Sequence, residues 1–213
     1  MDLFDEIDES QSLELAEGVM LLRGFALSEH ATMLCDWHNV VALAPFRHMV
    51  TPGGFTMSVA MTNCGELGWV TDKKGYRYDA LDPVTGKPWP AMPASFMALA
   101  RAAAKLAGYS EFTPDACLIN RYQVGARMSL HQDKNERDFT QPIVSVSLGV
   151  SAVFQLGGFE RVDKAVKLPL YHGDVLVWGG VSRLRYHGVL PLKVSHHPAF
   201  GEYRINLTFR KAG

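Results

Sequence analysis

The second half of the chain is a series of short runs in which apolar and polar residues alternate, and this feature limits the fold more than any other. Beyond Gly108, seven such runs are separated by turn residues: DACLINRYQ, ARMSLHQD, PIVSVSLG, AVFQL, KLPLYHGDVLVW, LRYHGVL and EYRINLTFR. A period of two is typical of strands that bury one face. So many short strands in succession predict a sandwich or a jelly roll.

Two helices are expected outside this β core. Residues 28–44 place apolar side chains on one face at helical spacing, and residues 93–108 begin with a proline and end at a glycine. The intervening residues 45–93 are rich in Gly and Pro with scattered aromatic residues, which predicts short strands and long loops. The expected fold is therefore α+β but mainly β, a jelly roll (double-stranded β-helix) with flanking helices.

The composition is that of a globular domain. Of 213 residues, 47% are hydrophobic, which excludes a disordered or collagen-like chain, and we find no repeat or linker that would divide it. Three widely separated cysteines exclude a disulfide scaffold and favour a reducing compartment. We expect a cytoplasmic protein with no membrane segment, because no apolar stretch is long enough to span a bilayer and the N-terminus is acidic.

Charge is distributed unevenly along the chain. Residues 1–18 contain seven acidic residues and no Lys or Arg, so the remainder has 21 basic residues against 15 acidic ones. We expect a flexible acidic leader over 1–18 and a single domain over 19–213. A modestly basic domain is compatible with a nucleic-acid partner, although a mixed solvated surface explains the same excess.

A few polar residues inside the predicted strands are the candidates for chemistry. The chain has no G-x-G-x-x-G, G-x-x-x-x-G-K-[ST], H-E-x-x-H or G-x-S-x-G motif. His131 and Asp133 are two residues apart in a strand, so they share a face and could bind one metal ion, with His187 as the best third ligand. Two histidines and one carboxylate are typical of non-haem Fe(II) oxygenases. A purely structural role for the histidines is the alternative.

A second polar pattern lies in YRINLTFR. Arg204 and Arg210 share one face of this strand with Asn206, and two guanidinium groups on one face could bind an elongated dianion such as 2-oxoglutarate. Asn120 and Tyr122 likewise share a face in LINRY and could bind a carboxylate. A surface strand and ordinary cross-strand contacts are the respective alternatives.

Several segments together closely resemble the AlkB family of bacterial Fe(II)- and 2-oxoglutarate-dependent dioxygenases, which repair alkylated DNA. They are PDACLINRY, SLHQDKNE, IVSVSLG, HGDVLVWGG, RLRYHGV, RINLTFR and the loop TPGGFTMSVAMTNCGELGW. The resemblance begins at about Gly18 and covers nearly all of the remaining chain. It implies a substrate-binding lid at about 45–92 and a jelly-roll core at about 112–213.

The resemblance implies two sets of residues around the reaction centre. Catalytic Fe(II) is expected on His131, Asp133 and His187. The cosubstrate 2-oxoglutarate is expected on Asn120, Tyr122, Arg204, Asn206 and Arg210, with Arg204 at the distal carboxylate and Arg210 at the one next to the metal. With O2, the implied reaction hydroxylates an N-methyl group of 1-methyladenine or 3-methylcytosine and releases succinate, CO2 and formaldehyde.

The resemblance also implies a base-binding pocket. The Trp69 indole is expected to stack on a base extracted from its strand, with Tyr76 close by. The other residues expected at the lid or pocket are Thr51, Met57, Met61, Tyr78, Ser129, Lys134, Asn135 and Arg161. The expected partner of a monomeric enzyme is alkylated DNA, preferably single-stranded, with RNA as a second candidate. A 2-oxoglutarate-dependent hydroxylase of a small molecule or protein side chain, and a non-enzymatic metal-binding jelly roll, are the alternatives.

One position departs from the family pattern. AlkB enzymes have an acidic residue two positions after the aspartate ligand, facing the exocyclic amine of the base, whereas this chain has Asn135. A neutral amide accepts a hydrogen bond but lacks Coulomb attraction to a cationic base. Glu136 is the nearest acidic residue that could replace the missing carboxylate. We therefore expect a narrower preference for cationic over neutral lesions.

Overall fold

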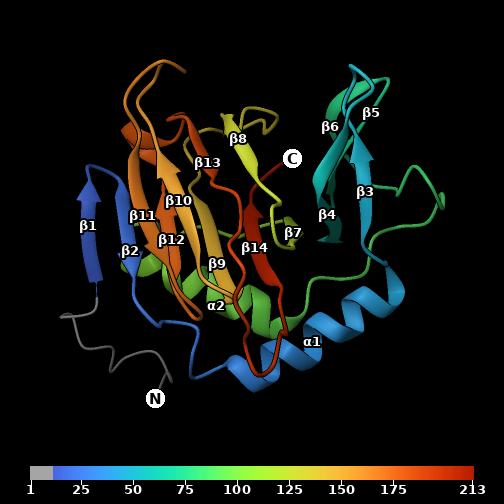
Figure 1. Cartoon of the computed structure of the whole chain (residues 1–213), viewed down its shortest axis with the longest axis horizontal. Coiled ribbons are helices and arrows are strands. Elements are labelled where there is room, and N and C mark those ends of the chain that lie inside the picture. Colours follow the sequence, from blue (N-terminus) through green and yellow to red (C-terminus); the bar gives the residue numbers. More distant parts are fainter. Residues whose placement is uncertain (1–11) are drawn as a thin grey trace.

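The structure, a computed structural model, describes residues 12–213 and is built on two facing β-sheets (Figure 1). The large sheet has eight strands in the order β1 (Ser12–Ala16), β2 (Val19–Leu22), β12 (Val175–Trp178), β9 (Ile143–Gly149), β14 (Arg204–Arg210), β7 (Ala116–Tyr122), β4 (Thr56–Gly65) and β3 (Arg47–Val50). The small sheet has four, in the order β11 (Val166–Leu170), β10 (Ala152–Leu156), β13 (His187–Val189) and β8 (Met128–His131). The mainly-β fold predicted from the sequence is confirmed.

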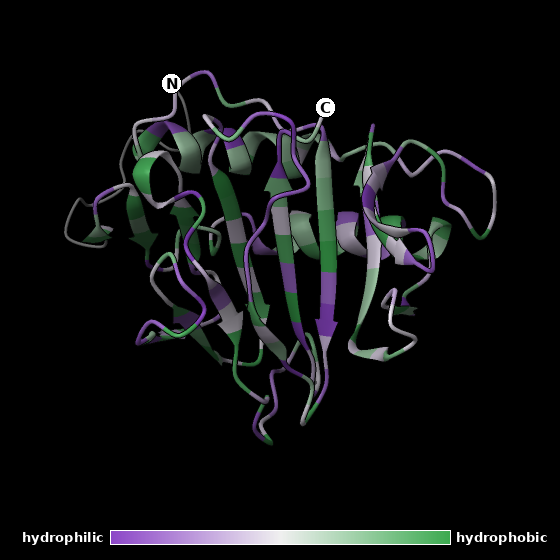
Figure 2. Ribbon diagram, turned by 90° about the horizontal axis from the view of Figure 1, so that it is seen from above, coloured by the Kyte–Doolittle hydropathy of each residue, from purple (hydrophilic) through white to green (hydrophobic). Residues whose placement is uncertain are grey.

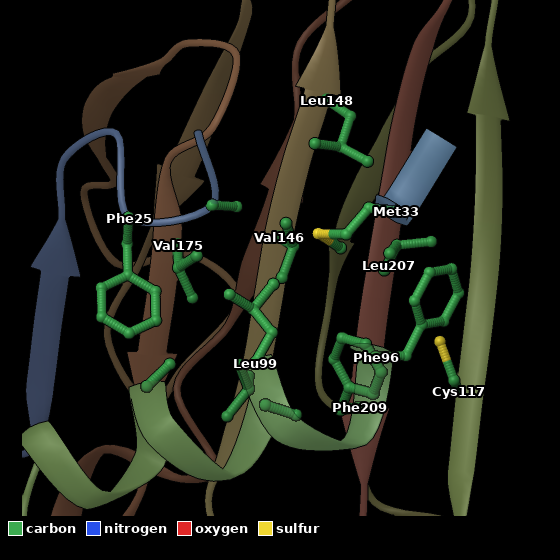
Figure 3. Packing of buried hydrophobic residues seen from close by; sticks show 14 of the residues in the cluster. Phe25, Met33, Phe96, Leu99, Cys117, Val146, Leu148, Val175, Leu207 and Phe209 are labelled. Carbon is green, nitrogen blue, oxygen red and sulfur yellow. The ribbon is translucent and has the colours of Figure 1, made fainter. Parts of the chain in front are cut away.

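Two helices cover the outer face of the large sheet. They are α1 (His30–Leu43) and α2 (Ala94–Leu106), each slightly shorter than predicted. Figure 3 shows Phe96 and Leu99 of α2 packed against Val146 and Phe209 of the sheet, and the rings of Phe96 and Phe209 meet edge to face at 6.1 Å. Burying each of these large side chains contributes roughly 1.5–3 kcal/mol. These contacts hold the large sheet rigid behind the site.

The alternation along β14 assigns its two faces to different environments. Ile205, Leu207 and Phe209 join the core beneath the helices. Arg204 and Arg210 project from the opposite face, toward the small sheet, and are only 1% and 6% exposed. The alternative of a surface strand is therefore wrong. Figure 2 shows this change between hydrophobic and hydrophilic residues along the strands.

The segment 45–92 is divided between the large sheet and a separate hairpin. Strand β4 pairs with β7 and is largely buried, so it is part of the large sheet. Strands β5 (Gly68–Asp72) and β6 (Gly75–Asp79) form a two-stranded sheet of their own, which stands beside β3 and β4 (Figure 1). The hairpin β5–β6 is the part of the predicted lid that lies outside both large layers.

The N-terminal leader differs from the prediction where the structure describes it. Residues Ser12–Ala16 form β1, which pairs with β2, so the flexible leader predicted over 1–18 does not include them. The backbone pairing with β2 satisfies the main-chain donors and acceptors of this strand, which contains one acidic residue, Glu14. Residues 1–11 lie outside the described part of the chain. No helix within residues 12–213 is long and apolar enough to cross a bilayer.

Candidate active site

A cavity of about 780 Å³ opens between the two sheets and brings nearly all of the predicted site residues together. The three predicted metal ligands and the five predicted 2-oxoglutarate residues all line it. Nine of the predicted substrate residues line it as well: Thr51, Met57, Met61, Trp69, Tyr76, Ser129, Lys134, Asn135 and Arg161. Of the predicted set, Tyr78 alone does not.

The predicted metal ligands converge at one end of this cavity. His131 ends β8 and lies opposite His187, which begins β13, while Asp133 follows β8 by two residues. One possible ligand atom from each side chain lies within 4.8 Å of the others. The Nε2 atoms of His131 and His187 lie 3.6 and 3.7 Å from the two carboxylate oxygens of Asp133. The three groups therefore surround a common point.

Hydrogen bonds orient both imidazole rings toward that point. Nδ1 of His131 lies 2.8 Å from the carbonyl oxygen of Ser129, and Nδ1 of His187 lies 3.1 Å from that of Arg185. Since a carbonyl only accepts, Nδ1–H is the donor and each Nε2 is left with its lone pair facing the shared point. Burial, together with the nearby His131, lowers the pKa of His187 to about 4, so its ring is neutral at pH 7. This donor set fits Fe(II).

Asp133 is ionised although it is buried. Burial by itself would raise its pKa, but Arg210, His187 and His131 together hold the pKa of this carboxyl well below its usual range. Nε and one terminal nitrogen of Arg210 donate to the same oxygen, Oδ2, at 2.9 and 2.6 Å. The site thus presents a negative charge next to the neutral ring of His187.

The guanidinium of Arg204 has unused donors deep in the cavity. It donates to the hydroxyl of Ser147 at 2.9 Å and lies over the ring of Tyr122 at 5.0 Å. Its Nε and its other terminal nitrogen are buried and have no hydrogen-bond partner among the described residues. A buried cation with unsatisfied donors is unfavourable, and a carboxylate is the ligand that best satisfies a guanidinium fork. This cradle fits one end of a dicarboxylate such as 2-oxoglutarate.

Asn120 and Asn206 face each other across β7 and β14. Nδ2 of Asn120 donates to Oδ1 of Asn206 at 3.4 Å, whereas Nδ2 of Asn206 donates to the hydroxyl of Ser145 at 2.8 Å. The Oδ1 atom of Asn120 is buried without a partner among the described residues. Asn120 Oδ1 is therefore available to a ligand in the cavity, between Arg204 and Arg210.

Two aromatic rings stand on the β5–β6 hairpin at the cavity. Trp69 of β5 and Tyr76 of β6 are stacked with ring centroids 5.8 Å apart and planes 23° apart. The indole N–H of Trp69 donates to Oδ1 of Asn135 at 3.2 Å. The ring of Tyr76 is 48% exposed, so this pair offers an aromatic surface to a ligand.

Tyr78 and Glu136 occupy positions that the sequence did not predict. Tyr78 lines a smaller cavity of about 240 Å³, and its hydroxyl donates to Glu136 at 2.6 Å. Glu136 is 6% exposed and faces Arg183 and Arg210 instead of the large cavity. The prediction that Glu136 could replace the acidic residue missing at position 135 is therefore wrong, because its charge is already compensated by two buried arginines.

Three further residues near the site were not predicted from the sequence. Ser145 and Ser147 share the cavity-facing side of β9, and the alternation in IVSVSLG could have revealed both. Arg183 contacts the segment around Asp133, yet nothing in its local sequence distinguishes it from a surface arginine.

The fold and the His-Asp-His site define a non-haem Fe(II) oxygenase. Residues 18–210 match the profile of the 2OG-Fe(II) oxygenase superfamily, to which the chain belongs. It is 59% identical to the alpha-ketoglutarate-dependent dioxygenase AlkB of Salmonella typhimurium and 57% identical to that of Escherichia coli, over all of this chain and 98% of each relative. A solved structure, that of OsALKBH1, superposes with a TM-score of 0.82 at 28% identity, covering 94% of this chain and 99% of that one. Fe(II) and 2-oxoglutarate (alpha-ketoglutarate) are therefore its metal and its cosubstrate.

Proposed function

We propose that this protein is an oxidative demethylase that repairs N-alkylated bases of the 1-methyladenine and 3-methylcytosine type in DNA, with RNA as a further substrate. The observation that supports this proposal is the pair Trp69 and Tyr76, which lines the same cavity as the three metal ligands. A small-molecule hydroxylase has no need of two stacked aromatic rings at its entrance, whereas an extracted base stacks on such rings.

In this proposal His131, Asp133 and His187 hold Fe(II) through two neutral imidazoles and one carboxylate. Arg204, with Asn120 and Tyr122, binds the distal carboxylate of 2-oxoglutarate, and its unpartnered donors support that role. Arg210 and Asn206 face the carboxylate next to the metal. When bound, Fe(II) with 2-oxoglutarate and O2 supplies the oxidant that hydroxylates the N-methyl carbon, which then leaves as formaldehyde.

The protein's own side chains orient the base and exclude water. Trp69 covers one face of the base and His131 lies against the other, while Met57 and Met61 supply apolar walls. Thr51, Lys134 and Arg161 line the same cavity and are proposed to meet the nucleic-acid backbone. We propose that the enzyme acts as a monomer. The three free cysteines support the reducing cytoplasm as its compartment.

The test is formaldehyde release from a short single-stranded DNA oligonucleotide containing 1-methyladenine, with Fe(II) and ascorbate, with and without 2-oxoglutarate. We expect release that requires both the metal and the keto acid, and the same assay on an RNA oligonucleotide tests the second substrate. Succinate formation without formaldehyde would refute demethylation and favour a hydroxylase with another substrate.

A further inference from the structure

A buried arginine outside the predicted site contacts the segment that carries Asp133. Arg183 follows a short 3-10 helix, η2 (Gly180–Ser182), and is 2% exposed. Its Nε donates to the carbonyl oxygen of Gln141 at 3.1 Å, and one terminal nitrogen donates to that of Asp133 at 2.8 Å. The other terminal nitrogen lies 3.1 Å from Oε2 of Glu136. All three nitrogens of this guanidinium therefore contact a single segment, residues 132–142.

That segment, residues 132–142, has no strand or helix to fix it. It connects β8 to β9, and its backbone lacks a ladder partner that would hold Asp133 toward the two histidines. Arg183 binds it near both ends and in the middle, and the ring of Phe139 lies 5.4 Å from the guanidinium carbon. The side-chain amide of Gln132 donates to the carbonyl oxygen of Leu184 at 2.6 Å and adds one more link. These side-chain contacts, together with one backbone hydrogen bond from Arg137 N–H to the carbonyl oxygen of Ala212 at 3.2 Å, hold the backbone from which Asp133 projects.

Glu136 links Arg183 to the cosubstrate residue Arg210, because it forms an ion pair with each of them. The side chain of Glu136 is 2% exposed, so its charge needs a buried counter-ion. Its Oε1 lies 3.3 Å from Nε of Arg210 and accepts the hydroxyl of Tyr78 at 2.6 Å. Two guanidinium groups and two carboxylates are thereby packed together; Asp133 and Arg210 line the cavity, whereas Arg183 and Glu136 do not.

We propose that Arg183 is a positioning residue, which holds Asp133 toward the metal and, through Glu136, holds Arg210 toward 2-oxoglutarate. The proposal rests on the metal and cosubstrate roles given under the proposed function. A planar guanidinium holds its nitrogens in one rigid fork, and the tetrahedral ammonium of lysine on its flexible stem does not reproduce that geometry. Groups that orient metal ligands from outside the coordination sphere typically change metal affinity or activity by about 10–100-fold when they are removed.

The test combines metal binding, which needs no turnover, with 2-oxoglutarate kinetics in the absence of nucleic acid. Mn(II), a hard cation accepted by histidine and carboxylate ligands, is titrated into the full chain, and the free ion is followed by electron paramagnetic resonance. We expect Arg183→Met to weaken Mn(II) binding by about 10–100-fold and to raise the KM for 2-oxoglutarate in the absence of nucleic acid. Arg23→Met is the matched control, because Arg23 also pairs with a buried carboxylate, Asp174, but far from this segment.

The control should lower the melting temperature and leave Mn(II) affinity within twofold of the wild-type value. If Arg183→Met does not fold, Arg183→Lys keeps the charge next to Glu136 and should still weaken Mn(II) binding several-fold. Wild-type affinity in a folded Arg183 variant, or an equal loss in Arg23→Met, would overturn the positioning role. A wild-type chain that binds no Mn(II) would instead refute the metal assignment on which the proposal rests.

Discussion

Arg210 donates two hydrogen bonds to a single oxygen of Asp133, Oδ2, and leaves Oδ1 facing Nε2 of His131 at 3.6 Å. The oxygen bound by the arginine, Oδ2, also lies 3.7 Å from Nε2 of His187, so each carboxylate oxygen faces one of the two histidines. The arginine proposed to face 2-oxoglutarate is therefore also the group that orients the carboxylate proposed to bind the metal.

This double role predicts that Arg210→Lys fails as a conservative replacement. An ammonium group lacks the rigid planar fork of a guanidinium, so both Asp133 and the cosubstrate lose an oriented partner. We expect kcat/KM for 2-oxoglutarate to fall by about 10–100-fold. Succinate formation at varied 2-oxoglutarate checks this, and an unchanged value would show that charge alone suffices.

Removal of a proposed ligand and removal of the stacking ring should have different effects. His131→Ala takes away one of the three groups around the metal, so it should abolish both demethylation and 2-oxoglutarate decarboxylation in the absence of nucleic acid. Trp69→Ala should leave that uncoupled decarboxylation intact and raise the KM for the oligonucleotide about tenfold or more, since stacking contributes about 1–3 kcal/mol per base. Equal loss of decarboxylation in both variants would contradict this division of roles.

Because of Asn135, the preference for cationic over neutral lesions should be smaller than in AlkB enzymes that have an acidic residue at this position. The Oδ1 atom of Asn135 accepts the indole N–H of Trp69 and has a second lone pair for a base, but the amide carries no charge. We expect Asn135→Asp to raise the rate on 1-methyladenine relative to 1-methylguanine, because a carboxylate attracts the cationic base. The measurement is the ratio of the two rates in matched oligonucleotides, and the same ratio in both proteins would refute the idea.

Acidification should destabilise the fold through His172. Its Nδ1 accepts the backbone N–H of Gly149 at 3.0 Å, and burial, followed by the neighbours His197 and His30, lowers its pKa to about 4, although Asp174 opposes this shift. Since the ring titrates near 6.5 when unfolded, the unfolded chain binds more protons between these two values. The free energy of unfolding therefore falls as pH drops from about 6.5 to about 4.

Urea unfolding at several pH values in this window checks that sign. In His172→Asn the side chain no longer titrates, so the loss of stability on acidification should be smaller than in the wild type. His38→Asn, which replaces an exposed histidine on α1, is the control and should retain the wild-type slope. An identical pH dependence in His172→Asn and the wild type would remove His172 as a cause.

Local patterns were sufficient to predict the mainly-β fold and the faces of its strands. Alternation in RINLTFR assigns Arg204, Asn206 and Arg210 to one face, because a strand repeats every two residues. The spacing in HQD also predicted that His131 and Asp133 meet, but β8 ends at His131 and Asp133 lies in the loop that follows, so strand periodicity is not the reason. These relations are complete within a few residues of sequence. The resemblance to the AlkB family added the base-binding residues.

Only the tertiary structure decided which residues meet across the site. His187 lies opposite His131 because β13 pairs with β8, and Arg183 reaches Asp133 from fifty residues away. The loop 132–142 has no ladder hydrogen bonds, and its conformation decides that Glu136 is buried against two arginines. The position of Tyr78 outside the large cavity likewise depends on this loop. Strand register and loop conformation are set by contacts between distant segments, and no local periodicity carries that information.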